Sequence, residues 1–263
     1  MGNGLFYIVM VSLRSPQGDA NMLQEYPRSK TGLELRQRLH EVRGDLSAAV
    51  PAARDGEHDP QFAMRSILAL QRGPVQYPRN KMIFIEGDPA EYIFLLIDGV
   101  VRSCRSFSDG NRSIVCFHIS GELFGFNGEQ THSLSAEAAT NTTMLVLKRS
   151  AVLAMVARDG RIANFLLANT TKELRRLQEH AVLISRNAQC RVATFLIDLS
   201  LRTGKTECLN LSMPHRDIAD YLGLEIETLS RVITEFERSG LVARASNRTL
   251  VLKNRTQLMR MMT

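Results

Sequence analysis

The hydrophobic pattern of the 263-residue chain is clearest near its C-terminal end, in the segment 214–240. Ile218, Ala219 and Leu222 share one face of a first short helix. A second helix follows, with apolar residues three or four positions apart at Ile226, Leu229, Ile233 and Phe236. Because Gly223 separates the two apolar faces, the pattern predicts two helices packed across a tight turn, as in a helix-turn-helix.

The polar residues of the second predicted helix gather on its opposite face. Glu227, Ser230 and Arg231 are spaced i, i+3 and i+4, so they share one exposed side. Arginine can donate two hydrogen bonds to guanine, glutamate can accept one from cytosine, and serine can do either. A plain surface pair between Glu227 and Arg231 is the alternative for an isolated helix. The paired apolar faces favour DNA recognition, with Glu227 holding the Arg231 side chain. Glu225 is an unusual residue at the N-cap position.

Two short β-rich runs follow, at 241–245 and 249–252, and a hairpin directly after a helix-turn-helix is a wing. Arg248 in this wing is a candidate for contact with a DNA phosphate. A further helix is predicted at 187–202 and a short strand at 209–211.

Residues 75–147 carry short β-rich runs, in the order KMIFIE, YIFLLI, VVRSC, SIVCFHI and MLVLK. Glycines fall between them every 11 or 12 residues, at 87, 99, 110 and 121. This even spacing is typical of an antiparallel roll or barrel. Asp109 and Gly110 suit a tight hairpin turn.

A helical region begins at 150–156, and from Ala163 onward apolar or small residues step by four and three. The positions after Ala163 are Leu167, Thr170, Leu174, Leu177, Ala181 and Ile184. This three-heptad pattern fits a helix lying on its own roll or a helix pairing with a second copy. Its length favours the dimer helix, although Thr170 weakens the middle of the seam.

Composition and charge restrict the possible partners and the cellular compartment of the protein. The net charge of +6 and the pI of about 9.4 permit nucleic-acid binding. No apolar run is long enough to span a membrane, and the short run at 5–13 lacks the preceding positive charge of a signal peptide. Four scattered thiols without metal-ligand spacing indicate a reduced, cytoplasmic protein with no metal site; they are Cys104, Cys116, Cys190 and Cys208. Cys190 and Cys208 flank the DNA-reading half and are the better redox candidates.

These motifs resemble the Crp–Fnr family of bacterial transcription regulators. The matching stretches are DIADYLGL at 217–224, ETLSR at 227–231, EGD at 86–88, DG at 98–99 and FHISGELFGF at 117–126. The Glu-x-x-Ser-Arg form is similar to the Fnr and FixK branch. The resemblance implies an α+β fold with an N-terminal antiparallel β-roll of the cyclic-nucleotide-binding type, a long dimerisation helix and a C-terminal winged helix-turn-helix. We expect these at 62–158, 159–186 and 187–263, after a poorly ordered extension at 1–61 that holds one possible helix at 31–42.

The same resemblance implies a homodimer on a palindrome of TTGA-type half-sites, with RNA polymerase as a further partner. Arg231 and Glu227 would read the G·C pair, Ser230 would contact a neighbouring thymine, and Arg216 would touch phosphate. The expected function is activation of genes for microaerobic or anaerobic respiration or nitrogen fixation.

Departures from the family's motifs reduce the number of ligands and cofactors that could control the protein's activity. Residues 1–103 contain no cysteine, so the iron–sulfur cluster of Fnr has no N-terminal ligands. Glu122 could bind a ribose, but the stretch 130–138 has no arginine for a cyclic phosphate. His118 is a lone strand histidine, more typical of structure than of haem ligation. The absence of His-x-His argues against a metal-dependent cupin enzyme. We therefore expect a non-enzymatic, FixK-like regulator without a cofactor; the alternative is a small-molecule-gated regulator of the same fold.

Overall fold

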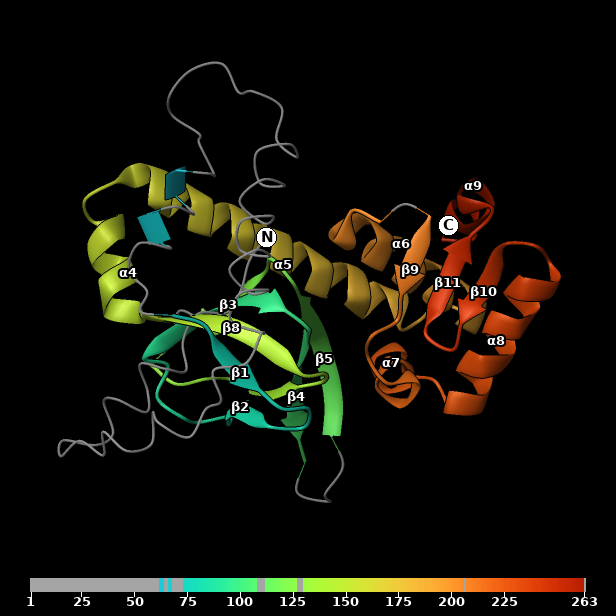
Figure 1. Ribbon diagram of the computed structural model, residues 1–263, viewed down its shortest axis with the longest axis horizontal. Helices are drawn as coiled ribbons and strands as arrows, with labels where there is room; N and C mark the ends of the chain where they lie inside the picture. The colour runs from blue at the N-terminus through green and yellow to red at the C-terminus, as the bar shows by residue number, and fades with distance from the viewer. Residues whose placement is uncertain are drawn as a thin grey trace, which may run out of the picture.

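The computed structural model describes residues 62–63, 66–67, 73–107, 112–126, 130–205 and 207–262. A β-roll is followed by a long helix, which leads to a C-terminal domain of helices and a small sheet (Figure 1). The expected α+β fold, with a roll, a long helix and a winged helix-turn-helix, is confirmed. The extension, its possible helix at 31–42 and the turn at Asp109 and Gly110 lie outside the described residues.

Two four-stranded antiparallel sheets form the roll. One has the order β1-β8-β3-β6 and the other β2-β7-β4-β5. The strands are β1 (Val75–Tyr77), β2 (Met82–Phe84), β3 (Tyr92–Asp98), β4 (Val100–Ser106), β5 (Arg112–Ile119), β6 (Leu123–Phe124), β7 (Ser135–Ala138) and β8 (Thr142–Lys148). The longest pairing joins β4 to β5, from Val100 opposite Ile119 to Ser106 opposite Arg112. Gly99, between β3 and β4, has a positive φ of 91°.

The first five residues of β4 and the last three of β5 are buried on both faces of the sheet. Val101 belongs to the core of the roll, whereas Val100 and Cys104 belong to a second core shared with the C-terminal domain. Phe117 and Ile119 of β5 are also part of that second core. Since successive side chains of a strand point to opposite faces, Val101 faces the roll interior, while Val100 and Arg102 face the C-terminal domain. The C-terminal domain therefore packs directly on the roll.

Two helices lead out of the roll, α4 (Arg149–Val156) and α5 (Gly160–Leu183). Asp159 caps α5 by accepting a hydrogen bond from the backbone N–H of Arg161 at 2.9 Å. With 24 residues, α5 is about 36 Å long, enough to run from the roll to the C-terminal domain (Figure 1). No helix in the described part of the chain is both long and apolar enough to cross a membrane.

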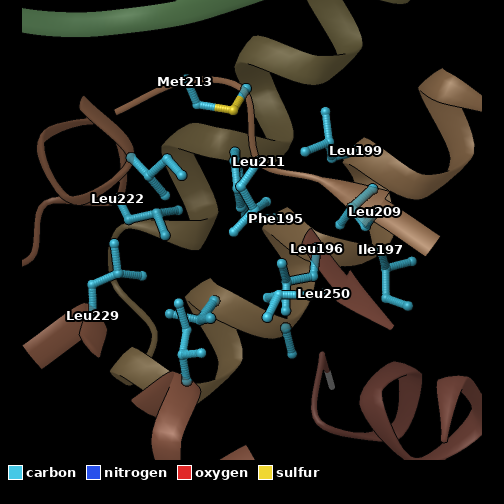
Figure 2. Close-up of a cluster of buried hydrophobic side chains, with 14 of the residues drawn as sticks. Phe195, Leu196, Ile197, Leu199, Leu209, Leu211, Met213, Leu222, Leu229 and Leu250 are labelled. Atoms are coloured by element: carbon cyan, nitrogen blue, oxygen red, sulfur yellow. The ribbon is translucent and has the colours of Figure 1, made fainter. Parts of the chain in front are cut away.

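The C-terminal domain holds α6 (Ala188–Thr203), α7 (His215–Leu222), α8 (Ile226–Arg238) and α9 (Arg255–Arg260), with a three-stranded sheet. The sheet has the order β10-β11-β9, from Val242–Ser246, Thr249–Leu252 and Cys208–Asn210. Leucines from α6, α7, α8 and the sheet meet around Phe195 (Figure 2). This common core holds the two helices of the helix-turn-helix at a fixed angle to the wing formed by β10 and β11.

The predicted strands and helices correspond closely to observed elements, with small shifts at their ends. The run 81–86 contributes only β2, and the strand predicted at 209–211 is β9, one residue earlier. Three strands, β1, β6 and β7, had no prediction. All four residues of β7 are buried, but the sequence Ser-Ala-Glu-Ala is short and contains no β-branched or aromatic residue, so its strand propensity is low.

Candidate nucleic-acid interface

The turn between α7 and α8 is fixed by Gly223. Its backbone is left-handed, with φ 60° and ψ 42°, a conformation that glycine adopts without strain. Arg191 of α6 donates hydrogen bonds of 3.0 Å to the carbonyls of both Leu222 and Gly223. These bonds satisfy carbonyls left unpaired at the end of α7 and tie the turn to α6.

The apolar face of α8 differs by one residue from the sequence prediction. Leu229, Ile233 and Phe236 are buried as expected, and Val232 is buried with them. Ile226 is 39% exposed, so its assignment to the buried stripe was wrong. The physical reason is its position at the first residue of α8, because the buried residues of this helix begin one turn later, at Leu229. Glu225 makes no side-chain cap bond, which agrees with its poor match to the N-cap position.

Glu227, Ser230 and Arg231 are all exposed on the outer face of α8. Ser230 and Arg231 border a shallow surface hollow together with Thr234, Glu235 and Arg238. Arg231 donates a long hydrogen bond of 3.4 Å to the Thr228 hydroxyl. The suggested pair between Glu227 and Arg231 is absent from the ion pairs of the described residues. Arg231 is thus held only weakly by its own helix.

Positive charge surrounds the start of α7. Arg216 on α7 and Arg248 in the wing are both exposed. Arg244 of β10 pairs with Glu237 of α8 at 3.1 Å, which joins the wing to the second helix. Burial, and then the charges of Arg244 and Arg248, lower the pKa of His215. The two wing arginines therefore act electrostatically on His215, the first residue of α7.

The first helix of the helix-turn-helix is anchored to the roll by a network of four charges: Arg102, Arg112, Glu137 and Asp217. Asp217 of α7 pairs with Arg102 of β4 and, at 3.1 Å, with Arg112 of β5. Glu137 of β7 pairs with the same two arginines at 2.7 and 3.0 Å. Arg102 and Asp217 are each about 3% exposed. Since two carboxylates face two guanidinium groups, the buried charges compensate one another.

A second contact joins α7 to α5. The Nε2 atom of His180 lies 2.7 Å from the Tyr221 carbonyl and donates its proton to it. The two rings are stacked with centroids 4.1 Å apart, and Tyr221 also meets the edge of Phe117 from β5. Tyr221 therefore connects the helix-turn-helix to the long helix and to the roll at one point.

A third contact uses Glu122, the residue considered for ribose binding. Its carboxylate pairs with Arg202 of α6 at 2.6 Å and with Arg176 of α5 at 2.9 Å. Burial alone would raise the pKa of Glu122, but Arg202 and then Arg176 lower it to about 2. The same carboxylate accepts the backbone N–H of Ile119 at 3.1 Å. Glu122 is thus a structural anion between roll, α5 and α6.

The seam residues on α5, and Ile184 at its C-cap, are mostly open to solvent in the single chain. Leu167 is 64% exposed, Leu174 55% and Ile184 37%, and Thr170 and Ala181 are also exposed. Ile162, Leu166 and Leu183 on the other side of the helix are buried. Leu177 departs from the pattern because it is half-buried beside Cys116 and Tyr221.

The sequence prediction missed the residues that hold the DNA-reading helices in place. Asp217 and Tyr221 were quoted in the DIADYLGL motif without a role, and Arg102 lay unnoticed inside the apolar run VVRSC. A charge in the middle of a buried strand was the available signal, because such a charge requires a partner. No local sequence pattern could identify Asp217 as the partner of Arg102, because the two residues are 115 positions apart.

Together these features define a DNA-binding regulator with a roll, a long helix and a winged helix-turn-helix. The family model of the cyclic nucleotide-binding domain matches residues 74–159, and the family model of the Crp-like helix-turn-helix domain matches 190–261.

The nitrogen fixation regulation protein FixK of Azorhizobium caulinodans is 37% identical over 201 residues, covering 74% of this chain and 81% of the relative. The transcriptional activatory protein AadR of Rhodopseudomonas palustris is 31% identical over 173 residues, covering 64% and 72%. The structure of FixK2 from Bradyrhizobium japonicum is 36% identical with a TM-score of 0.69, covering 73% of this chain and 97% of that one.

The chain belongs to the Crp–Fnr family of transcription regulators, in its FixK-like branch. Its helix-turn-helix binds DNA, and the family fold is that of a dimer.

Proposed function

We propose that the chain is a homodimeric activator that binds palindromic DNA with TTGA-type half-sites. The observation that carries this proposal is the outer face of α8. Glu227, Ser230 and Arg231 are exposed there, while Leu229 and Ile233 on the opposite face are buried. A polar, accessible helix face set between a first helix and a wing matches the way such motifs enter the major groove.

Each residue of this face has a role that its chemistry supports. Among the described residues, the Arg231 guanidinium makes only the long hydrogen bond to Thr228, so it is available to DNA. It donates to guanine O6 and N7. Glu227 accepts from the amino group of the paired cytosine, and Ser230 contacts the neighbouring thymine. Arg216 and Arg248 neutralise backbone phosphates and fix the register of the protein on the duplex.

The seam on α5 is the proposed dimer contact, formed by Leu167, Thr170, Leu174, Leu177, Ala181 and Ile184. Leu167 and Leu174 expose more than half of their surface in a single chain, and burial against the same residues of a second copy would remove it from water. A two-fold axis along this seam brings two copies of α8 to the two halves of a palindrome.

The proposed target genes serve microaerobic or anaerobic respiration or nitrogen fixation. The support is the similarity to a protein named a nitrogen fixation regulation protein and to one named a transcriptional activatory protein. In this proposal RNA polymerase is the protein partner, the site of action is the cytoplasm, and no enzymatic step is involved. The proposed units are the roll at 62–158, the dimerisation helix at 159–186 and the DNA-binding domain at 187–263.

Control by a cyclic nucleotide is not part of the proposal. Glu122 is fully engaged by Arg176, Arg202 and the Ile119 N–H, so it has no free carboxylate for a ribose. The roll interior next to it is filled by aromatic rings, with Phe94 and Phe124 stacked at 4.9 Å and Phe84 on His132 at 3.7 Å.

Genome-wide mapping of bound sites tests the proposal, because it reports specificity and target genes together. The expected result is enrichment of a TTGA-type palindrome upstream of respiratory or nitrogen-fixation genes. In vitro transcription with purified RNA polymerase should then rise when the protein is added to those promoters. On a promoter with one half-site scrambled, adding the protein should leave transcription at its basal level. Bound sites without a palindrome would refute the proposal.

A further inference from the structure

Three side chains with metal-binding atoms converge where β5 passes α5. Cys116 and His118 are two residues apart on β5, so they project from the same side of this edge strand. Glu173 faces them from the middle of α5. One ligand atom from each of the three lies within 4.8 Å of the other two. No sequence pattern indicates this group, because Glu173 is far from the two β5 residues along the chain.

The spacing of these atoms fits a tetrahedral ion. The Sγ atom of Cys116 lies 3.5 Å from Nε2 of His118. In a tetrahedral zinc site, a sulfur at about 2.3 Å and a nitrogen at about 2.0 Å from the ion are separated by roughly 3.5 Å. The three residues also line one cavity of about 20 Å³. That volume holds about one water molecule, and therefore one ion.

The surrounding charges are already balanced before an ion is added. Arg176 and Arg202 line the same cavity, but both pair with Glu122, and Arg202 also pairs with Asp198 at 3.1 Å. Glu173 is half-buried, and no hydrogen bond or ion pair holds its carboxylate among the described residues. A divalent cation would displace the Cys116 thiol proton into solvent, and the ion with the resulting thiolate and the Glu173 carboxylate would form a neutral group.

The imidazole is held in place for such a role. The His118 ring stacks on Phe124 with centroids 4.7 Å apart and planes 13° apart. The Ser103 hydroxyl lies 2.9 Å from the same Nε2 that faces Cys116. A bound ion would take over this contact and leave Ser103 beside it, where outer groups orient metal ligands.

We propose that Cys116, His118 and Glu173 bind one divalent transition-metal ion of the Zn²⁺ class, with a fourth position open to water. A ligand set of one sulfur, one nitrogen and one oxygen selects Zn²⁺ or a similar ion over Mg²⁺ or Ca²⁺. Three protein ligands with an open fourth position are typical of sites that exchange a ligand. The ion would join β5 of the roll to α5, beside Tyr221 of the helix-turn-helix.

Metal titration of the full chain tests this site independently of DNA binding. Chelator-treated protein is titrated with ZnCl₂ in competition with a chromophoric chelator, and with CoCl₂ to record the thiolate-to-cobalt absorption band. We expect one ion per chain and a cobalt–thiolate band. Glu173→Gln should weaken zinc binding at least tenfold, and Cys116→Ser should also abolish the cobalt–thiolate band.

Matched controls separate this site from other thiols and from unfolding. Cys208→Ser changes an exposed thiol and Cys104→Ser a buried one on the neighbouring strand, and both should keep the ion. Zn²⁺ should raise the melting temperature of the wild type and of Cys208→Ser, but not that of Glu173→Gln. Circular dichroism should confirm that each variant is folded. Zinc affinity unchanged in both Cys116→Ser and Glu173→Gln, or no ion bound by the wild type, would overturn the proposal.

Discussion

Arg102 of the roll and Asp217 of the first DNA-binding helix form a buried ion pair across 115 positions of the sequence. Arg102 also forms an ion pair with the carboxylate of Glu137, at 2.7 Å. A buried ion pair is expensive to break from one side, because the remaining charge stays in the interior without a partner. The orientation of the helix-turn-helix is therefore determined by the roll as well as by its own core.

Neutralising Asp217 should destabilise the protein through this contact. Asp217→Asn leaves Arg102 and Arg112 facing Glu137 alone, and we expect a loss of roughly 3–5 kcal/mol in the free energy of unfolding. Urea denaturation measures the loss, and hydrogen exchange should rise in β4, β5 and α7. Asp220→Asn on the same helix removes the same charge outside the network and should change stability by less than about 0.5 kcal/mol. Equal effects of the two substitutions would show that the network does not hold the domains together.

Gly99 should not tolerate a side chain. Its φ is +91°, and a Cβ atom there would lie 2.5 Å from the Asn141 carbonyl oxygen and 2.7 Å from Thr142 Cγ2. Gly99→Ala should lower the free energy of unfolding by roughly 1–3 kcal/mol, because it combines backbone strain with a steric clash. Gly160→Ala is the control, since nothing lies within 4 Å of that position and it begins α5. Thermal denaturation should show Gly160→Ala at least as stable as the wild type, and a stable Gly99→Ala would contradict the turn geometry.

Charge in the α5 seam should separate the two subunits. Leu174 is 55% exposed in the single chain and central in the repeat, so Leu174→Glu places two like charges opposite each other in a dimer. Analytical ultracentrifugation should detect monomers, and affinity for a full palindrome should fall at least tenfold. Gln178→Glu adds the same charge at an exposed position outside the seam and should remain dimeric. A dimeric Leu174→Glu protein would exclude this seam.

Acidification should loosen the contact between α5 and α7. Burial lowers the pKa of His180, although its hydrogen bond to the Tyr221 carbonyl opposes the shift. Because the folded pKa lies below the value of 6.5 expected for an unfolded chain, the unfolded state binds the proton first. The stabilisation is present above pH 6.5 and declines as the pH falls toward the folded pKa. Denaturant unfolding from pH 7.5 to 5 should show the wild type losing more stability than His180→Gln; parallel curves would contradict this role.

The motifs that sequence analysis recovered are local ones. The apolar steps around Gly223 and the repeat from Ala163 to Ile184 lie within single helices, so spacing alone predicts them. The helix-turn-helix, its wing and the long helix were therefore predicted close to their observed bounds. The turn at Gly99 was predicted for the same reason, because its glycine stands between two apolar runs.

The contacts that join the domains could not be predicted from local spacing. Arg102 meets Asp217, and Cys116 meets Glu173, only after the C-terminal domain and α5 have packed on β5. The near-continuous burial of β4 has the same origin, because Val100 and Cys104 face the C-terminal domain rather than water. Ile226 was assigned to the apolar stripe because its spacing fits, but spacing does not reveal that burial begins only one turn into the helix.

Whether α8 reads the DNA sequence is tested most directly by the effect of Arg231→Ala on binding to a TTGA-type palindrome, measured by fluorescence anisotropy. A bidentate arginine–guanine contact contributes roughly 1–3 kcal/mol per half-site, so specific affinity should fall at least tenfold while the dimer remains intact. Arg238→Ala, at the other end of α8, removes the same charge and should reduce affinity for specific and scrambled DNA alike. Replacing the guanine in each half-site should weaken the wild type but not Arg231→Ala further. Undiminished specific binding by Arg231→Ala would contradict the assignment of α8 as the helix that reads DNA.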